Sequence, residues 1–175
     1  MSAERNQQYR VRFEDVAAHA REITIQDGRH APLLIVEGSK SLAVSQIQEM
    51  PETHDERMEL MRLFGLAAAR TGKFGRLEQI FFVSEGWMSV ARPDNPPQMR
   101  PSEDPHRKEV LIISGLELKA RRTQLRLFEM VRNGDQEVVD LPELSPPQER
   151  EASAQVPLLE AFAQGYEGAF LAQVC

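Results

Sequence analysis

The sequence predicts an α+β fold, built mainly on an antiparallel sheet of about five or six strands with helices packed on one face. Three observations lead to this prediction. Apolar runs of strand length cluster between helical segments in the order α-β-β-α-β-β-β-(β)-α, so no parallel βαβ series is needed. Glycine-containing turn signals separate several of these runs. The chain has 175 residues, a usual size for one domain, so residues 1–175 are expected to form a single domain.

The N-terminal part is expected to contain one helix followed by a hairpin. Residues 1–12 are polar and are expected to be frayed. The next apolar residues are spaced as on one helix face: Phe13, Val16, Ala17, Ala20 and Ile23. Asp27-Gly28 ends this helix. Residues 31–36 and 42–47 then form two strands joined at Gly38-Ser39, and the second strand, being half apolar, is expected near an edge.

The best-marked helix spans about residues 53–72. Thr53 and Glu56 match the capping-box pattern, in which each side chain bonds the other residue's backbone amide. Gly72 is a suitable stop. Gly65 costs up to about 1 kcal/mol in a helix interior relative to alanine. Its presence beside small residues indicates close approach to a sheet or another helix.

The run Leu77–Val90 is expected to be a central strand, because both of its alternating faces are largely apolar. Alternation places Glu85 and Trp87 on one face and Ser84 and Gly86 on the other. This polar interruption of an apolar strand is the most unusual feature of the chain.

The second half is expected to be an antiparallel meander closed by a helix. Residues 92–108 form a loop with five prolines; a loop of this length is usually functional or disordered. Strands are expected at 110–118, 124–132 and 136–141, with the last two joined by the hairpin signal Asn133-Gly134. Residues 142–157 are expected to be a surface linker, and residues 158–170 an amphipathic helix.

Composition excludes several classes of function. No apolar run approaches the roughly 20 residues of a membrane span, and the one cysteine, Cys175, has no internal disulfide partner. Both facts indicate a cytoplasmic protein without a membrane partner. The net charge of −6 disfavours nucleic-acid binding. Nucleotide-binding and metal-ligand motifs are absent and the four histidines, expected at the surface, are far apart in sequence, so we expect neither a cofactor nor a metal.

Glu85 is the first candidate for a catalytic group. If the face that it shares with Trp87 is covered, desolvation would raise the pKa of the Glu85 carboxyl toward values useful in acid–base catalysis. Glu129 is a second carboxylate on an apolar strand face. The alternative for both is a structural ion pair, for example with Arg126 or Arg132.

The proline-rich loop supplies further candidate ligand-binding residues. Arg100 and Arg107 could hold an anionic group beside Trp87, and His106 lies in the same charged segment. The patterns FVSEGWM and PSEDPHRKE, within residues 81–113, resemble small uncharacterised prokaryotic proteins that share the pattern FVSExWM … PSxDPxRxE. This resemblance implies no activity, cofactor or partner.

Two functions remain open at this stage. The first is a non-catalytic binding or assembly module, which self-associates or binds another protein. The alternative is a small-ligand-binding protein or enzyme with Glu85 in a pocket beside Trp87 and the 92–108 loop. The sequence leaves the question of enzymatic activity open, and favours the first function because no catalytic constellation is present.

Overall fold

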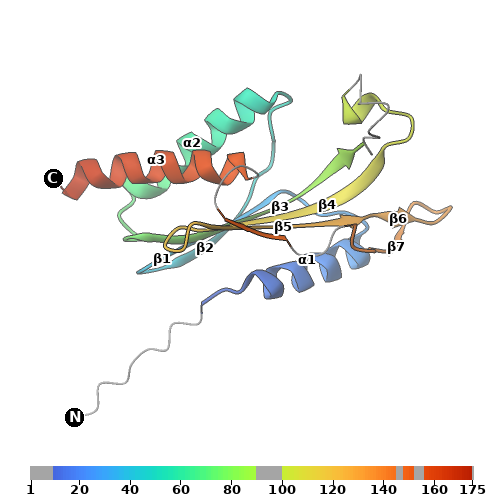
Figure 1. Ribbon diagram of the computed structural model, residues 1–175, viewed down its shortest axis with the longest axis horizontal. Coiled ribbons are helices and arrows are strands. Elements are labelled where there is room, and N and C mark those ends of the chain that lie inside the picture. Colours follow the sequence, from blue (N-terminus) through green and yellow to red (C-terminus); the bar gives the residue numbers. More distant parts are fainter. Residues whose placement is uncertain (1–9, 90–99, 145–147, 152–155, 175) are drawn as a thin grey trace, which may run out of the picture.

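A computed structural model of the chain describes residues 10–89, 100–144, 148–151 and 156–174, and confirms the α+β class. Within these residues, six strands form one antiparallel sheet in the order β2-β1-β3-β4-β5-β8 (Figure 1). The elements of this sheet are β1 (Leu33–Gly38), β2 (Leu42–Gln46), β3 (Leu77–Met88), β4 (Lys108–Glu117), β5 (Arg122–Glu129) and β8 (Gln148–Glu151). Strands β6 (Val131–Arg132) and β7 (Val138–Asp140) form a separate two-stranded sheet.

Three helices within the described residues cover the two faces of the main sheet (Figure 1). Helices α2 (His54–Arg70) and α3 (Pro157–Val174) lie together on one face, as predicted. Helix α1 (Phe13–Asp27) lies on the other, over Ile35, Phe81 and Val83. The central strands carry apolar side chains on both faces, so each face needs its own cover; α1 therefore departs from the one-face arrangement.

Helices α2 and α3 approach each other closely through glycine. A Cβ added at Gly65 would lie 2.0 Å from the carbonyl oxygen of Phe162, and one added at Gly165 would lie 2.0 Å from that of Arg62. The two glycines therefore let the helix backbones touch, and the close approach expected at Gly65 is confirmed. Tyr166, which is only 1% exposed, packs in this layer and donates a hydrogen bond to the carbonyl of Gly75 at 2.6 Å.

One edge strand of the main sheet was predicted from the sequence, and the other was not. Strand β2 forms one edge, as expected. The other edge is β8, which lies inside the expected linker 142–157 and pairs with β5 from Arg122↔Glu151 to Leu125↔Gln148. Its sequence, QERE, has no apolar alternation, so nothing in the pattern indicated a strand. The hairpin at 133–134 forms, but its strands pair with each other and not with the main sheet.

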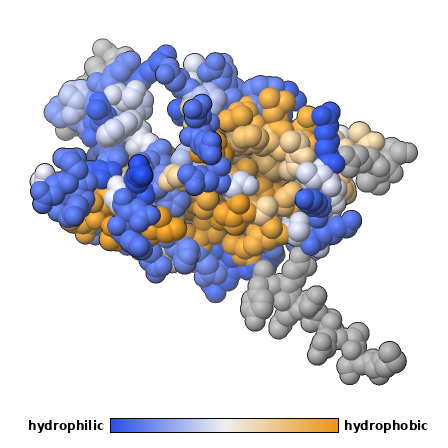
Figure 2. Space-filling model, turned by 180° about the vertical axis from the view of Figure 1, so that it is seen from behind, coloured by the Kyte–Doolittle hydropathy of each residue, from blue (hydrophilic) through white to orange (hydrophobic). Residues whose placement is uncertain are grey.

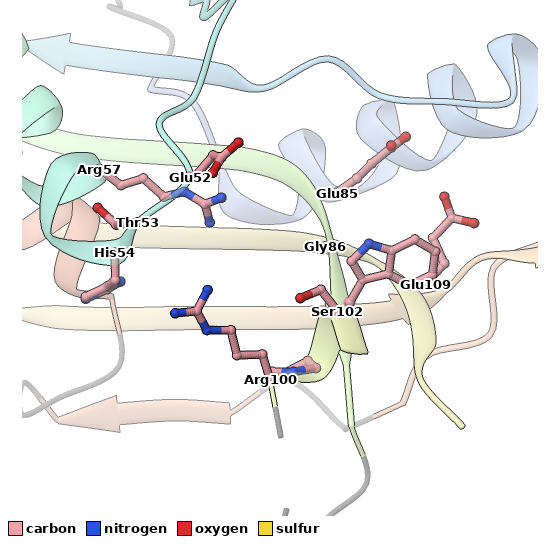
Figure 3. A pocket seen from close by; sticks show the side chains of 11 residues that line it. Glu52, Thr53, His54, Arg57, Glu85, Gly86, Arg100, Ser102 and Glu109 are labelled. Carbon is pink, nitrogen blue, oxygen red and sulfur yellow. The ribbon is translucent and has the colours of Figure 1, made fainter. Parts of the chain in front are cut away.

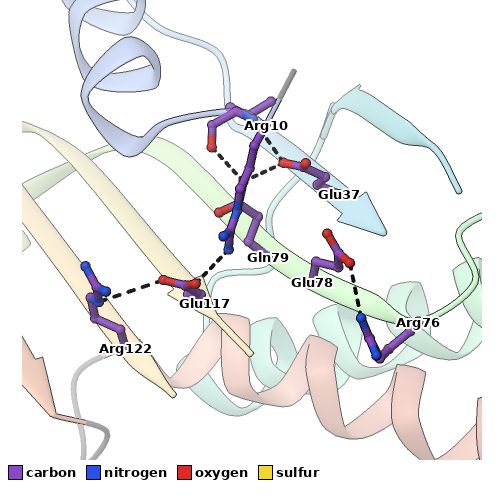
Figure 4. Close-up of polar contacts among 8 residues, drawn as sticks. Arg10, Glu37, Arg76, Glu78, Gln79, Glu117 and Arg122 are labelled. Atoms are coloured by element: carbon purple, nitrogen blue, oxygen red, sulfur yellow. Dashed lines mark hydrogen bonds and ion pairs between the residues drawn. The ribbon is translucent and has the colours of Figure 1, made fainter. Parts of the chain in front are cut away.

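A polar cluster centred on the buried residues Glu37 and Gln79 holds the segment before α1 against the sheet (Figure 4). Glu37 is only 3% exposed, and its carboxylate accepts hydrogen bonds from the Gln79 side chain and from the backbone amide of Val11. Gln79 also donates to the Val11 carbonyl at 2.6 Å, and Arg10 pairs with Glu117 at 2.7 Å. Residues 10–11 are thus held in place, whereas residues 1–9 of the expected frayed terminus lie outside the described residues. None of the described helices is long and apolar enough to cross a membrane.

Candidate functional site

A cavity of about 720 Å³ opens at one end of the sheet, between the start of α2 and the strands β3 and β4. We call it the cleft. Its first wall comes from residues 52–54 and Arg57, its second from 85–87 and Glu109, and its third from 100–102. The space-filling view shows an opening framed by hydrophilic residues at this end of the molecule, while apolar residues gather on the other half of the same face (Figure 2).

The capping box builds the first wall. The Thr53 hydroxyl accepts from the Glu56 amide at 3.3 Å, and the Glu56 carboxylate accepts from the Thr53 amide at 3.4 Å. These reciprocal bonds fix where α2 begins. In the same turn, Arg57 donates from Nε to the Pro51 carbonyl at 2.5 Å. Arg57 is therefore held at its Nε, and its guanidinium group points into the cleft (Figure 3).

The second wall comes mainly from residues 85–87, in the outer half of β3. Strand β1 pairs with β3 only as far as Leu33↔Val83, so beyond that point β3 pairs with β4 alone. Trp87 lies in this half and is 45% exposed. The guanidinium of Arg107 lies 4.4 Å from the centre of the Trp87 ring, within the range of a cation–π contact.

The third wall comes from Arg100 and the start of a short 3-10 helix, η1 (Pro101–Glu103), which the following turn holds in place. Arg107 donates to the Ser102 carbonyl at 2.5 Å, and the Asp104 carboxylate accepts from the His106 amide at 2.8 Å. The bond from the His106 amide lowers the pKa of the Asp104 carboxyl below its ordinary value. This part of the predicted 92–108 loop is thus ordered by its own hydrogen bonds, while residues 92–99 lie outside the described residues.

The carboxylates of the strand wall already have partners. The Glu85 side chain accepts a hydrogen bond from the His30 amide and extends away from the centre of the cleft (Figure 3). Glu109 accepts two bonds from Arg132, at 2.6 and 2.8 Å. Donating these bonds to Glu109 raises the pKa of the Arg132 guanidinium above its ordinary value. The negative charge of Glu109 is therefore balanced within the protein itself.

Two arginines that point into the cleft differ from these carboxylates in having no partner of opposite charge within the described ranges. Within the described ranges, neither Arg57 nor Arg100 forms an ion pair with a carboxylate. Figure 3 shows their guanidinium groups reaching toward each other from α2 and from the start of η1. Glu52 stands on the same wall as Arg57, but in the described part of the chain no ion pair joins it to either arginine. Two cations facing one space repel each other, so an anion placed between the two guanidinium groups would be favoured.

Some of the site residues predicted from the sequence line the cleft, and others do not. Glu85, Trp87 and Arg100 line the cleft, and Arg107 reaches it through the Trp87 ring. His106 is exposed and contributes its backbone amide to Asp104.

Glu129 is not part of the cleft wall. It lies opposite Val110 and pairs with Lys108 at 2.6 Å, whereas Glu85 lies opposite Leu111, so the two carboxylates occupy different faces of the sheet. Neither arginine expected as a partner pairs with Glu129: Arg126 binds Glu14 and Glu143, and Arg132 binds Glu109.

His30 corrects the expectation that all four histidines lie at the surface. It is only 6% exposed, with Nδ1 at 2.7 Å from the Ala31 carbonyl. Because a carbonyl can only accept, Nδ1 carries the proton. The residue is buried because its backbone amide is drawn to the Glu85 carboxylate across the end of β3, a contact between positions 55 apart that no local pattern reveals.

Sequence reasoning missed Arg57 and Glu109. One signal could have found Arg57: it is a cation near the start of a helix, where the helix dipole favours acids and where Asp55 and Glu56 already lie. Glu109 gave no comparable signal, because its role depends on the register that brings it opposite Trp87. No three His, Cys, Asp or Glu side chains of the described chain segments are arranged to hold a metal ion.

The chain matches a known protein family. A family model described as bacteriophage lambda protein ea47 matches residues 1–172. No curated protein matches the chain, and no solved structure does so either.

Proposed function

The chain belongs to the family described as bacteriophage lambda protein ea47, and from the geometry of its cleft we propose that it is a non-catalytic binding module for an anionic group. One observation carries the proposal: Arg57 and Arg100 point into the same 720 Å³ cavity without carboxylate partners in the described chain. Ligand pockets typically have volumes of about 300–1,000 Å³. Charge-assisted hydrogen bonds from arginine to carboxylate or phosphate are among the strongest in proteins.

The state of Glu85 supports binding over catalysis. Its carboxylate accepts the His30 amide and turns away from the two guanidinium groups. A general acid or base must reach the proton that it transfers, at about 2.6–3.2 Å from the substrate atom. Glu85 instead positions the chain entering β1. Glu85→Gln is therefore expected to retain ligand binding.

Titration with small anions tests this function. Trp87, the only tryptophan, lines the cleft, so its fluorescence should respond to glutarate or pyrophosphate. We expect Arg57→Gln and Arg100→Gln each to weaken binding by about tenfold, because each removes a charge-assisted hydrogen bond to the anion. Arg70→Gln is the matched control, because Arg70 is exposed at the far end of α2. Equal affinities for all three variants, or no binding of either anion, would refute the proposal.

Self-association is a second candidate, which the edge strand β2 favours. Leu42 and Val44 are 49% and 58% exposed, and the strand LAVSQ contains no charged residue or proline. Natural sheets usually protect an open edge with such residues. If β2 pairs with a second copy, Val44→Lys should convert a dimer to a monomer in light scattering. A monomer at high concentration before the substitution would exclude this candidate.

A further inference from the structure

The outer half of β3 lines the cleft with residues 85–87 and, among the described strands, has no paired strand on its β1 side. The Leu118 amide donates to the Glu78 carbonyl at 2.9 Å, and the β3–β4 register continues without a shift from Gln79 to Met88. Residues of an antiparallel strand alternate in the neighbour that they bond. The even-numbered residues of β3 therefore bond to β4, and the peptide groups of Glu85 and Trp87 point toward the opposite edge.

Strand β1 does not occupy that edge. Its last pair with β3 is Leu33↔Val83. Ala31 would be the next partner, opposite Glu85, but it makes no backbone hydrogen bond to β3, and within the described residues the backbone groups of Trp87 have no partner on this side. The cleft thus borders a short strand edge at Glu85 and Trp87. On this side, the amides and carbonyls of these two residues have no backbone hydrogen-bond partner among the described residues.

From these two features we propose that the cleft binds an extended acidic peptide, which adds to the free edge of β3 as a short strand. The proposal rests on the anion-binding function above and specifies its ligand. Main-chain groups of the peptide would bond those of Glu85 and Trp87, and an acidic side chain would lie between Arg57 and Arg100. Strand addition is a known mode of peptide recognition, in which backbone bonds give affinity and side-chain pockets give specificity.

A peptide satisfies both features, whereas a small anion satisfies only one. A free phosphate or carboxylate could sit between the guanidinium groups, but it would leave the edge amides and carbonyls without partners. An extended chain supplies donors and acceptors alternately and repeats its side chains on one face about every 7 Å. An acid fits because Arg57 and Arg100 face the cleft without an ion pair among the described residues. Of the three carboxylates in the lining, Glu85 and Glu109 are already engaged, and Glu52 stands on the same wall as Arg57.

Selection from a library of randomised heptapeptides tests this inference on the full-length protein. We expect the enriched sequences to contain Asp or Glu at a fixed position. Synthetic copies of the best sequence should bind at least about tenfold more weakly to the Arg57→Gln/Arg100→Gln variant, and with unchanged affinity to Arg70→Gln. Replacing the peptide's acid by its amide should weaken binding to the same extent. Methylating alternate peptide nitrogens in one of the two registers should cost about tenfold, because the edge bonds are lost, and the other register should be tolerated.

Each contrary outcome has a separate meaning. If glutarate or pyrophosphate binds but no peptide is enriched, or if both methylated registers bind equally, strand addition is refuted and anion binding stands. If an oligothymidylate displaces the peptide and binds more tightly, the ligand is a nucleic acid and the peptide assignment is wrong. If neither small anions nor peptides bind, both the inference and the proposed function fail. Circular dichroism of each variant separates loss of binding from loss of folding.

Discussion

Replacing Gly165 by alanine should destabilise the protein, although alanine is the better helix former. The added Cβ would lie 2.0 Å from the backbone oxygen of Arg62, whereas ordinary contacts begin at 3.4 Å. The helices would therefore have to separate by about 1.4 Å. The obstacle is backbone on a packed neighbouring helix, so no side chain can rotate out of the way.

The expected change in the free energy of unfolding is the difference between two opposing contributions. Overpacking of a core costs about 1–3 kcal/mol, and occasionally more, while alanine gains up to about 1 kcal/mol in helix propensity. We expect a net loss of about 2 kcal/mol in the free energy of unfolding. For a chain of this size that corresponds to a fall of about 4–8 °C in melting temperature.

Gly168 in the same helix is the matched control. A Cβ added there meets nothing within 4 Å, so Gly168→Ala should gain up to about 1 kcal/mol from propensity alone. Urea denaturation with an unchanged slope measures both variants. If Gly165→Ala is as stable as Gly168→Ala, the close crossing of α2 and α3 is wrong.

Three further outcomes are expected. Gln79→Leu removes one donor from the buried Glu37 carboxylate and should cost about 2 kcal/mol of unfolding free energy; a cost below about 0.5 kcal/mol would contradict the cluster's role. Burial raises the pKa of the Tyr166 phenol above its ordinary value of 10.0, so the unfolded chain releases this proton first and the unfolding free energy should fall as pH rises above about 10. Tyr166→Phe should remove that part of the fall, and an identical pH profile for both proteins would refute it. Arg107→Ala uncovers the Trp87 ring and should increase quenching of its fluorescence by acrylamide, whereas Arg121→Ala should leave quenching unchanged.

Local signals predicted most of the fold. The capping box placed the start of α2 at the correct residue, because Thr53 and Glu56 lie three positions apart and their reciprocal bonds are local. The meander from β3 to β5 followed from apolar alternation. Strand β8 could not be predicted because its residues are polar, and its pairing depends on the free edge of β5.

The candidate site was only half predictable. Trp87 and Glu85 stood out as polar and aromatic interruptions of an apolar strand, and Arg100 was in the neighbouring loop. The cleft itself arises where the start of α2 faces the end of β3, some 30 positions later in the chain. Whether a charge in it is free or paired depends on partners such as His30 and Arg132, which the sheet register brings into contact.

The most direct test observes the arginine side chains themselves. In a nitrogen-15 spectrum of the Nε–H groups, glutarate should shift the Arg57 and Arg100 signals with one common affinity. Arg126 and Arg132, whose guanidinium groups are bound by Glu143 and Glu109, should stay in place. If the Arg57 and Arg100 signals do not move, or if all arginine signals shift together, then the cleft is not the anion-binding site.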